Sequence, residues 1–170
     1  LHGNELLPLA AAHQAHLGFE AAVAGSIPII ANLTHSLVAE EHQWLAGIIN
    51  GTCNFILTAM SERGESFADA LAEAQQLGYA EADPSFDVEG IDAAHKLTIL
   101  TALGFDTGFN YSDIYTEGIS RLTVEDIEYS SQLGYRIKHL GLARRLADGI
   151  EARVHPVLVP KNHLLASIDD

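Results

Sequence analysis

The sequence predicts an α+β domain in which helices pack on one face of a mixed, mostly antiparallel sheet. Apolar residues at helical spacing fill the middle of the chain, and a strand-like apolar run precedes them. Two extended runs near the end flank Asp148-Gly149, a dipeptide typical of hairpin turns. With 170 residues, 48% of them hydrophobic, the chain is long enough for one domain with a buried core.

The first quarter of the chain predicts one helix and two strands. Asn4 is expected to cap a helix that runs to about Leu17 and stops at Gly18. The stretch FEAAVAG that follows is predicted to be a short strand, and SIPII to begin a new segment. Gln43–Ile49 (QWLAGII) is the clearest predicted strand, because an apolar run of strand length ends there at an Asn-Gly turn pair.

Three helices are predicted in the middle of the chain. TCNFILTAMSERG has helical spacing and ends at Gly64, and Ser66 is placed to cap FADALAEAQQLG, which ends at Gly78. A third helix is predicted from Val88 to about Leu103.

The last third of the chain predicts a capped helix followed by a hairpin. Thr123 and Asp126 have the spacing of a capping box at a helix start. YRIKHLGLARRL and EARVHPVLVP are then expected to pair as antiparallel strands.

Composition excludes several classes of protein. The formal net charge is −14 with nine lysines and arginines, which argues against a nucleic-acid surface and favours a small molecule or another protein as partner. No apolar run approaches the ~20 residues of a membrane span. Cys53 stands alone, so no internal disulfide or multi-cysteine metal cluster is expected, in keeping with a cytoplasmic protein. Because the chain begins with leucine, we expect it to be a piece of a longer protein.

The stretch GYAEADPSFDVEGIDAAHK gathers five carboxylates ahead of one lysine: Glu81, Asp83, Asp87, Glu89 and Asp92, then Lys96. On a helix, Asp92 and Lys96 lie four residues apart on one face. The stretch is either a solvated acidic helix start with a surface ion pair, worth ~0.3–0.5 kcal/mol, or a site in which a desolvated lysine donates a proton. Its spacing does not fit a calcium-binding EF-hand loop, where Val88 would occupy the glycine position.

Other candidate sites are weaker. The nine histidines include no HxxxH pair with an intervening glutamate, and we expect surface positions for His2, His13, His16, His35 and His42. His95 is expected to have a packing role and Cys53 to be a buried thiol. No two glycines stand one residue apart, so the sequence has no dinucleotide-binding fingerprint.

Three stretches, FEAAVAGSIPII, GIINGTCNFILTAM and LGYAEADPSFDVEGIDAAHK, resemble homoserine dehydrogenases and occur in the order of that family. The resemblance covers essentially residues 1–170 and implies that they form the substrate-binding, catalytic and dimerisation domain, without the Rossmann cofactor-binding domain. It also implies a cytoplasmic homodimer that interconverts aspartate semialdehyde and homoserine with NADPH or NADH, in the biosynthesis of threonine and methionine.

The resemblance implies roles for individual residues. Lys96 matches the catalytic lysine that moves the proton at the substrate oxygen, and Asp92 matches the acid near the reacting centre. The expected substrate-binding residues are Glu81, Asp87, Asn50, Gly51 and Thr52, the last three forming an NGT turn that binds the substrate or faces the nicotinamide.

The resemblance further implies a monovalent cation held by Glu20, Val23, Gly25 and Ile27, where the alternative is a strand and turn with a buried acid. Ser26 stands where many members have glycine, and the family's upstream lysine in an ANK motif is not in this sequence. Two other functions stay open from the residues alone: a binding module for a small amino acid, in which Lys96 is only a counter-ion, and a structural dimer module.

Overall fold

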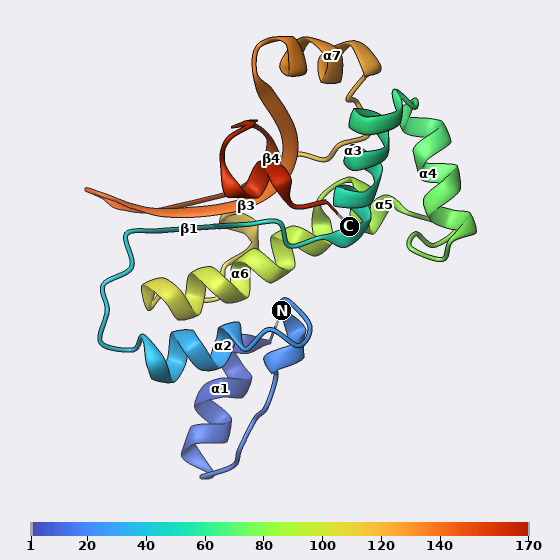
Figure 1. Cartoon of the computed structure of the whole chain (residues 1–170). Coiled ribbons are helices and arrows are strands. Elements are labelled where there is room, and N and C mark those ends of the chain that lie inside the picture. Colours follow the sequence, from blue (N-terminus) through green and yellow to red (C-terminus); the bar gives the residue numbers. More distant parts are fainter. Residues whose placement is uncertain (1, 170) are drawn as a thin grey trace.

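A computed structural model of the chain describes residues 2–169, and its centre is a four-stranded sheet in the order β1-β3-β4-β2 (Figure 1). β3 (Tyr135–Leu146) and β4 (Gly149–Pro160) form the predicted antiparallel hairpin. β1 (Trp44–Gly47) pairs antiparallel with β3, and β2 (Tyr115–Thr116) pairs parallel with β4. The predicted mixed, mostly antiparallel sheet is confirmed.

The helices of the described chain are α1 (Gly3–Ala12), α2 (Ile29–Ala31), α3 (Gly51–Arg63), α4 (Phe67–Gln76), α5 (Ser85–Val88), α6 (Ile91–Phe105) and α7 (Val124–Gln132). Short 3-10 turns occur at Glu20–Ala22, Tyr111–Asp113 and Leu164–Ser167, and a π turn at Asn32–Ser36.

Local capping signals define several helix ends of α3, α4 and α7. Gly64 ends α3 in the left-handed region at φ 66°, and the Ser66 hydroxyl accepts the Asp69 N–H at the start of α4. Thr123 and Asp126 form the predicted capping box of α7. These three predictions are confirmed, because each depends on residues within one turn.

Three sequence predictions are wrong in part. The first helix begins at Gly3, so Asn4 lies inside it and does not cap it, and it ends at Ala12 rather than near Leu17. FEAAVAG is not a strand: Glu20–Ala22 is a 3-10 turn, and Ala24 at φ 59° leaves the extended region. The helix predicted from Val88 is divided in two, because Gly90 adopts a left-handed φ of 80° between α5 and α6.

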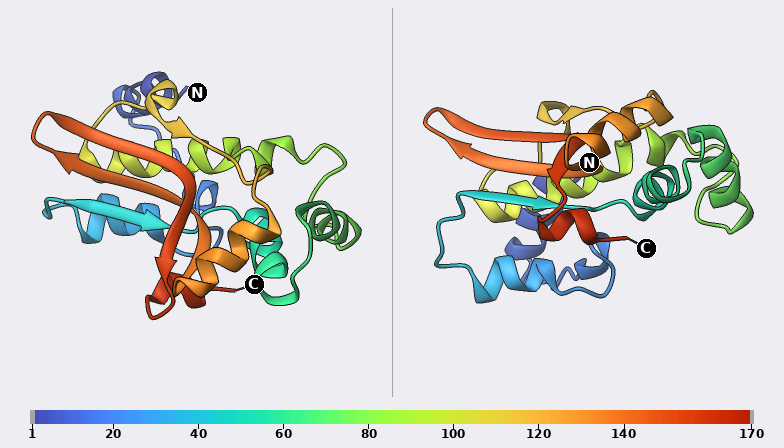
Figure 2. Two further views of the ribbon diagram at one scale, coloured as in Figure 1. Left: turned by 90° about the horizontal axis from the view of Figure 1, so that it is seen from above. Right: turned by 45° about the horizontal axis from the view of Figure 1, so that its top comes forward.

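Helices pack on one face of the sheet. Leu97 of α6 is fully buried against Ala143 and Val154 of the hairpin, and Ile137 of β3 packs into a second apolar cluster formed mainly by α3 and α4. Ile137 and Ala143 share a parity along β3 and therefore a face of the sheet. Figure 2 shows α6 running along the hairpin, and Figure 1 shows α1 and α2 on the far side of α6.

The opposite face of the sheet is covered at one end only. Leu140 and Val159 pack there against Ala166 of the 3-10 turn Leu164–Ser167. Lys138 is also buried on that face. Its Nζ donates to the Asn54 side chain of α3 at 3.1 Å and to the Asp169 carboxylate at 3.3 Å, so it ties the last described residues to α3. The remainder of this face carries the exposed rings of Trp44 and Tyr115. Within residues 2–169, no helix combines the length and apolar character that crossing a bilayer requires.

Candidate active site

A cavity of about 450 Å³ opens where α3, α5 and α6 meet. Its lining consists of Asn50, Gly51, Thr52, Phe55, Tyr79, Asp87, Asp92 and Lys96. Six of the seven residues expected to bind or convert the substrate are in this lining. The structure therefore brings together residues that are up to 46 positions apart in the sequence.

Asn50 is the centre of the hydrogen-bond network in this cavity. It is 5% exposed, and its Oδ1 accepts the Cys53 N–H at 2.8 Å, which caps α3. Because Oδ1 is committed to an N–H, Nδ2 faces the other way and donates to Asp87 Oδ1 and to Asp92 Oδ2, each at 2.8 Å. One amide thus holds two carboxylates, from α5 and from α6, at a fixed separation.

Lys96 extends the network by one more group. Its Nζ donates to Asp92 Oδ2 at 2.6 Å and to the Ile49 carbonyl oxygen at 3.2 Å. The Lys96 and Asp92 side chains are 28% and 19% exposed, so the pair is partly desolvated but open to the cavity. The four-residue spacing on α6 puts the ammonium one turn above the carboxylate, as the sequence predicts. Two of the three N–H groups of the ammonium are used by these bonds, and the third has no partner among the described residues.

Cys53 is a buried thiol that contacts the same network. Its Sγ donates to the Asp87 carbonyl oxygen at 3.3 Å. Burial raises the pKa of the thiol far above its usual value, and the charges of Asp87 and Asp92 raise it further. A neutral thiol at this position confirms the predicted buried cysteine.

Two lining residues, Tyr79 and Phe55, are missing from the sequence prediction. Their rings meet edge to face with centroids 5.1 Å apart, and the Tyr79 carbonyl oxygen accepts the Thr52 hydroxyl at 2.7 Å. Tyr79 stands inside the acidic stretch, directly after Gly78, and Phe55 lies three residues after Thr52 on α3. The predicted NGT turn is the cap and first turn of α3, so helical spacing from Thr52 is the signal that could have found Phe55.

Two acids of the same stretch have other surroundings. Glu81 is exposed and outside the cavity lining, and its backbone carbonyl accepts the Gln75 side chain at 3.0 Å. Asp83 accepts the hydroxyl and the N–H of Ser85, and these bonds hold its pKa below the usual range. Asp83 therefore stabilises the turn before α5 rather than the cavity.

The residues expected to hold a cation lie together in the turn 20–27, away from this cavity lining. The Glu20 carboxylate accepts the N–H groups of Ile30 and Ala31 at 2.7 and 2.8 Å, at the start of α2. The Ile27 carbonyl oxygen accepts the Ile29 N–H at 2.8 Å. Each of these oxygens keeps a second lone pair, so the turn is compatible with a cation but has another structural reason to exist.

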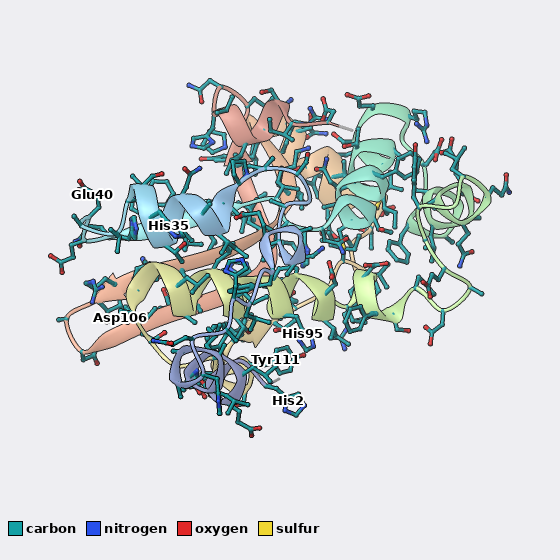
Figure 3. All side chains as sticks on the ribbon, turned by 90° about the horizontal axis from the view of Figure 1, so that it is seen from below. His2, His35, Glu40, His95, Asp106 and Tyr111 are labelled. Carbon is teal, nitrogen blue, oxygen red and sulfur yellow. The ribbon has the colours of Figure 1, made fainter. Side chains whose placement is uncertain are left out.

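His95 has the packing role that was predicted. Its ring stacks on Tyr111 with centroids 4.4 Å apart (Figure 3). It also stacks on Phe86 with centroids 5.7 Å apart. Of the histidines expected at the surface, His2, His13, His16 and His35 are exposed and His42 is half-buried. Among residues 2–169, no group of three or more His, Cys, Asp or Glu side chains has a geometry that holds a metal ion.

Comparison with known proteins agrees with the resemblance. The family model for homoserine dehydrogenase matches residues 28–170. Homoserine dehydrogenases from Pseudomonas aeruginosa and Neisseria gonorrhoeae are each 57% identical over 99% of the chain, which spans about 39% of their length.

Solved structures give the same relationship. The homoserine dehydrogenase of Thiobacillus denitrificans is 58% identical with a TM-score of 0.96, covering 99% of this chain and 39% of its own. A hyperthermophilic archaeal homoserine dehydrogenase solved in complex with NADPH is 28% identical with a TM-score of 0.84, covering 99% of this chain and 48% of its own. The chain therefore belongs to the homoserine dehydrogenase family.

Proposed function

We propose that this chain is the substrate-binding and proton-transferring part of an oxidoreductase that interconverts aspartate semialdehyde and homoserine. The observation that carries the proposal is the connected series Asp87–Asn50–Asp92–Lys96 on the wall of an open cavity. In this view residues 1–170 form the substrate-binding, catalytic and dimerisation domain, and the cofactor-binding domain is not in this chain.

The charges of the cavity suit an amino-acid substrate. Such a substrate carries an ammonium group, a carboxylate and a reacting carbonyl. Asp87 offers carboxylate oxygen to the ammonium, and Glu81, two residues after Tyr79, is a further proposed ligand. Gly51 and Thr52 begin α3, where unpaired N–H groups attract a carboxylate.

Lys96 performs the proton step in this proposal. As a hydride reaches the carbonyl carbon, the developing oxyanion needs a proton from a group within hydrogen-bond reach. Lys96 has an N–H that is not committed to Asp92 or to Ile49, and Asp92 fixes its position. In the reverse direction, the neutral amine takes the proton from the homoserine hydroxyl.

NADPH or NADH supplies the hydride, but we assign none of its ligands to this chain. No two glycines in the sequence stand one residue apart, so the turn that usually receives a pyrophosphate is not among these residues. The chain's own contribution is to bind and orient the substrate and to hold its proton donor.

Activity of the longer protein tests this function. We expect the chain, carried in a protein with the flanking sequence of its relatives, to oxidise NADPH or NADH only when aspartate semialdehyde is added. Homoserine binding without turnover would instead support the amino-acid-binding module. A protein that neither binds homoserine nor reacts would leave only the structural module.

We propose a homodimer formed by the open face of the sheet. Trp44 and Leu142 give this face apolar area around a hollow of about 420 Å³, and Glu151 lies there between Arg144 and Arg153. Because this face carries both positive and negative side chains, a second copy related by a two-fold axis can place opposite charges against each other. A cytoplasmic location belongs to the same proposal, supported by a lone, buried and unreactive thiol.

A monovalent cation at the turn 20–27 is the final part of the proposal. The Glu20 carboxylate and the Ile27 carbonyl oxygen keep lone pairs beyond those used by N–H groups of this turn and of α2. A cation there would join the turn to α2 and leave the substrate cavity unaltered.

A further inference from the structure

The two carboxylates held by Asn50 are separated by a single backbone corner. Asp87 lies in α5, Asp92 lies in the first turn of α6, and the corner Val88–Gly90 connects them. Gly90 turns the chain with a left-handed φ of 80°, a backbone conformation in which a residue with a side chain would be strained. The relative position of the carboxylates therefore depends on how firmly this corner is held.

Gly118 holds the corner from one side by close backbone approach. A Cβ built on Gly118 would lie 2.5 Å from Glu89 Cα and still closer to the Val88 carbonyl oxygen, so any side chain here forces the backbone to move. The following residue, Ile119, donates its N–H to the same Val88 oxygen at 2.8 Å. Segment 118–119 thus lies directly against the corner.

His139 holds the corner from the sheet. A Cβ on Gly90 would be 3.2 Å from His139 Cε1 and 3.3 Å from Nε2, so the imidazole lies against the corner backbone. His139 is 4% exposed, and its Nε2 donates to the Glu117 carbonyl oxygen at 2.9 Å. The Glu117 N–H in turn donates to Val154 of β4 at 2.8 Å. A continuous series of contacts therefore runs from the sheet to the corner.

We propose that Gly118 and His139 are positioning residues for catalysis: together they clamp the corner and so fix the distance between Asp87 and Asp92. The proposal rests on the function proposed above. Lys96 and Asp92 share one helix, so their pairing does not need the clamp. Asp87 does need it, because Asn50 satisfies both carboxylates only when the corner holds them at one separation.

Two pairs of variants in the full-length enzyme separate positioning from general packing. Gly118→Ala pushes the corner away, whereas Gly149→Ala is the matched control, because a Cβ at Gly149 meets nothing within 4 Å. His139→Leu removes the bond to Glu117, whereas His139→Gln places an amide N–H near the position of Nε2 and should restore it.

We expect Gly118→Ala and His139→Leu to lower kcat by about 10–100-fold, the scale of a misplacement of up to 1 Å. Both should also shift the pH profile of kcat, because the carboxylates near Lys96 change position. Gly149→Ala and His139→Gln should keep kcat within about twofold. Crystal structures of the variants should show Asn50 Nδ2 bonded to only one of the two carboxylates in Gly118→Ala and in His139→Leu.

The crystal structures decide the question independently of activity. If Asn50 keeps both bonds in Gly118→Ala and in His139→Leu, the clamp does not position the carboxylates and the inference is overturned. If Gly118→Ala does not fold, the His139 pair gives the same decision. A wild-type enzyme without turnover would defeat the proposed function, while the Asn50 distances would still test the clamp.

Discussion

Lys96 is the residue on which the proposed chemistry depends. Its partners are Asp92, one helical turn away, and the Ile49 carbonyl oxygen, 47 residues earlier in the chain. The pairing with Asp92 was predictable from the four-residue spacing alone. The role of Asn50 was not predictable in the same way. Its bonds to Asp87 and Asp92 span 37 and 42 residues, and no local pattern encodes such distances.

Replacing Lys96 tests the proton step. We expect Lys96→Ala to lower kcat by ~100-fold or more, the scale of lost general acid catalysis. Lys96→Arg should fail as well, because a guanidinium keeps its proton at any working pH. Turnover at saturating substrate, with thermal melting to confirm folding, is the measurement. Near-normal turnover of the arginine variant would make Lys96 a counter-ion.

The variant Asn50→Asp distinguishes the two roles of Asn50, which caps α3 through its oxygen and bridges Asp87 and Asp92 through its nitrogen. The new carboxylate can still accept the Cys53 N–H, so the cap of α3 is kept, but a buried third carboxylate should lower the melting temperature. The two N–H donors are lost, and a third negative charge is placed beside Asp87 and Asp92. We expect kcat to fall by at least ~10-fold at neutral pH. Unchanged kcat would show that the bridge has no part in turnover.

At the scale of elements, the sequence predicts correctly those helix starts and hairpins whose signals lie within a few residues of one another. Ser66 and Thr123 cap their helices as predicted, and the predicted hairpin forms with its turn one residue earlier, at Ala147 and Asp148, because Gly149 already pairs with Leu146. FEAAVAG failed because Glu20 bonds to N–H groups 10 and 11 residues further on, which turns the chain back. β2 was not predicted, since a two-residue strand has no period to detect.

The Glu20 turn allows a prediction about the cation. If a cation is bound there, the melting temperature should be higher in KCl or NaCl than in choline chloride at equal ionic strength, because only a native-state ligand stabilises. Glu20→Gln should remove the difference while still accepting one N–H from α2. Equal melting of the wild type in all three salts would argue against the site.

At the scale of the whole molecule, the sequence predicted helices on one face of the sheet, and the structure has this arrangement. Alternation along β3 and β4 defines two faces, but it does not say which of them stays open. Trp44 is 67% exposed on this face in the described chain.

Trp44→Glu tests the proposed dimer. In a two-fold interface the new carboxylate is present in both copies, and each is buried without a partner. We therefore expect the association constant to fall by at least ~100-fold. Tyr129→Glu, on the exposed side of α7, is the control and should leave association unchanged. Sedimentation velocity over a range of concentrations gives the answer. A Trp44→Glu protein that remains as dimeric as the control would place the interface elsewhere.

Stability should also depend on pH through His139. Burial, with a smaller contribution from His155, lowers its pKa below the ordinary 6.5, although Glu117 acts in the opposite direction. Below pH 6.5 the His139 imidazole therefore binds a proton in the unfolded chain but not in the folded chain, so the free energy of unfolding falls as pH decreases. Denaturant titrations between about pH 7 and pH 5 should show a shallower fall for His139→Gln than for wild type. Parallel curves would assign the effect to other groups.

The double use of Asn50 makes one backbone amide a reporter of the whole cavity. The Cys53 N–H is bonded to the oxygen of the side chain whose nitrogen holds Asp87 and Asp92, so it exchanges with solvent only when that side chain moves away. Hydrogen exchange at this single position would then measure how often the cavity comes apart in the folded protein. A substrate that binds the assembled cavity should slow that exchange in proportion to its occupancy.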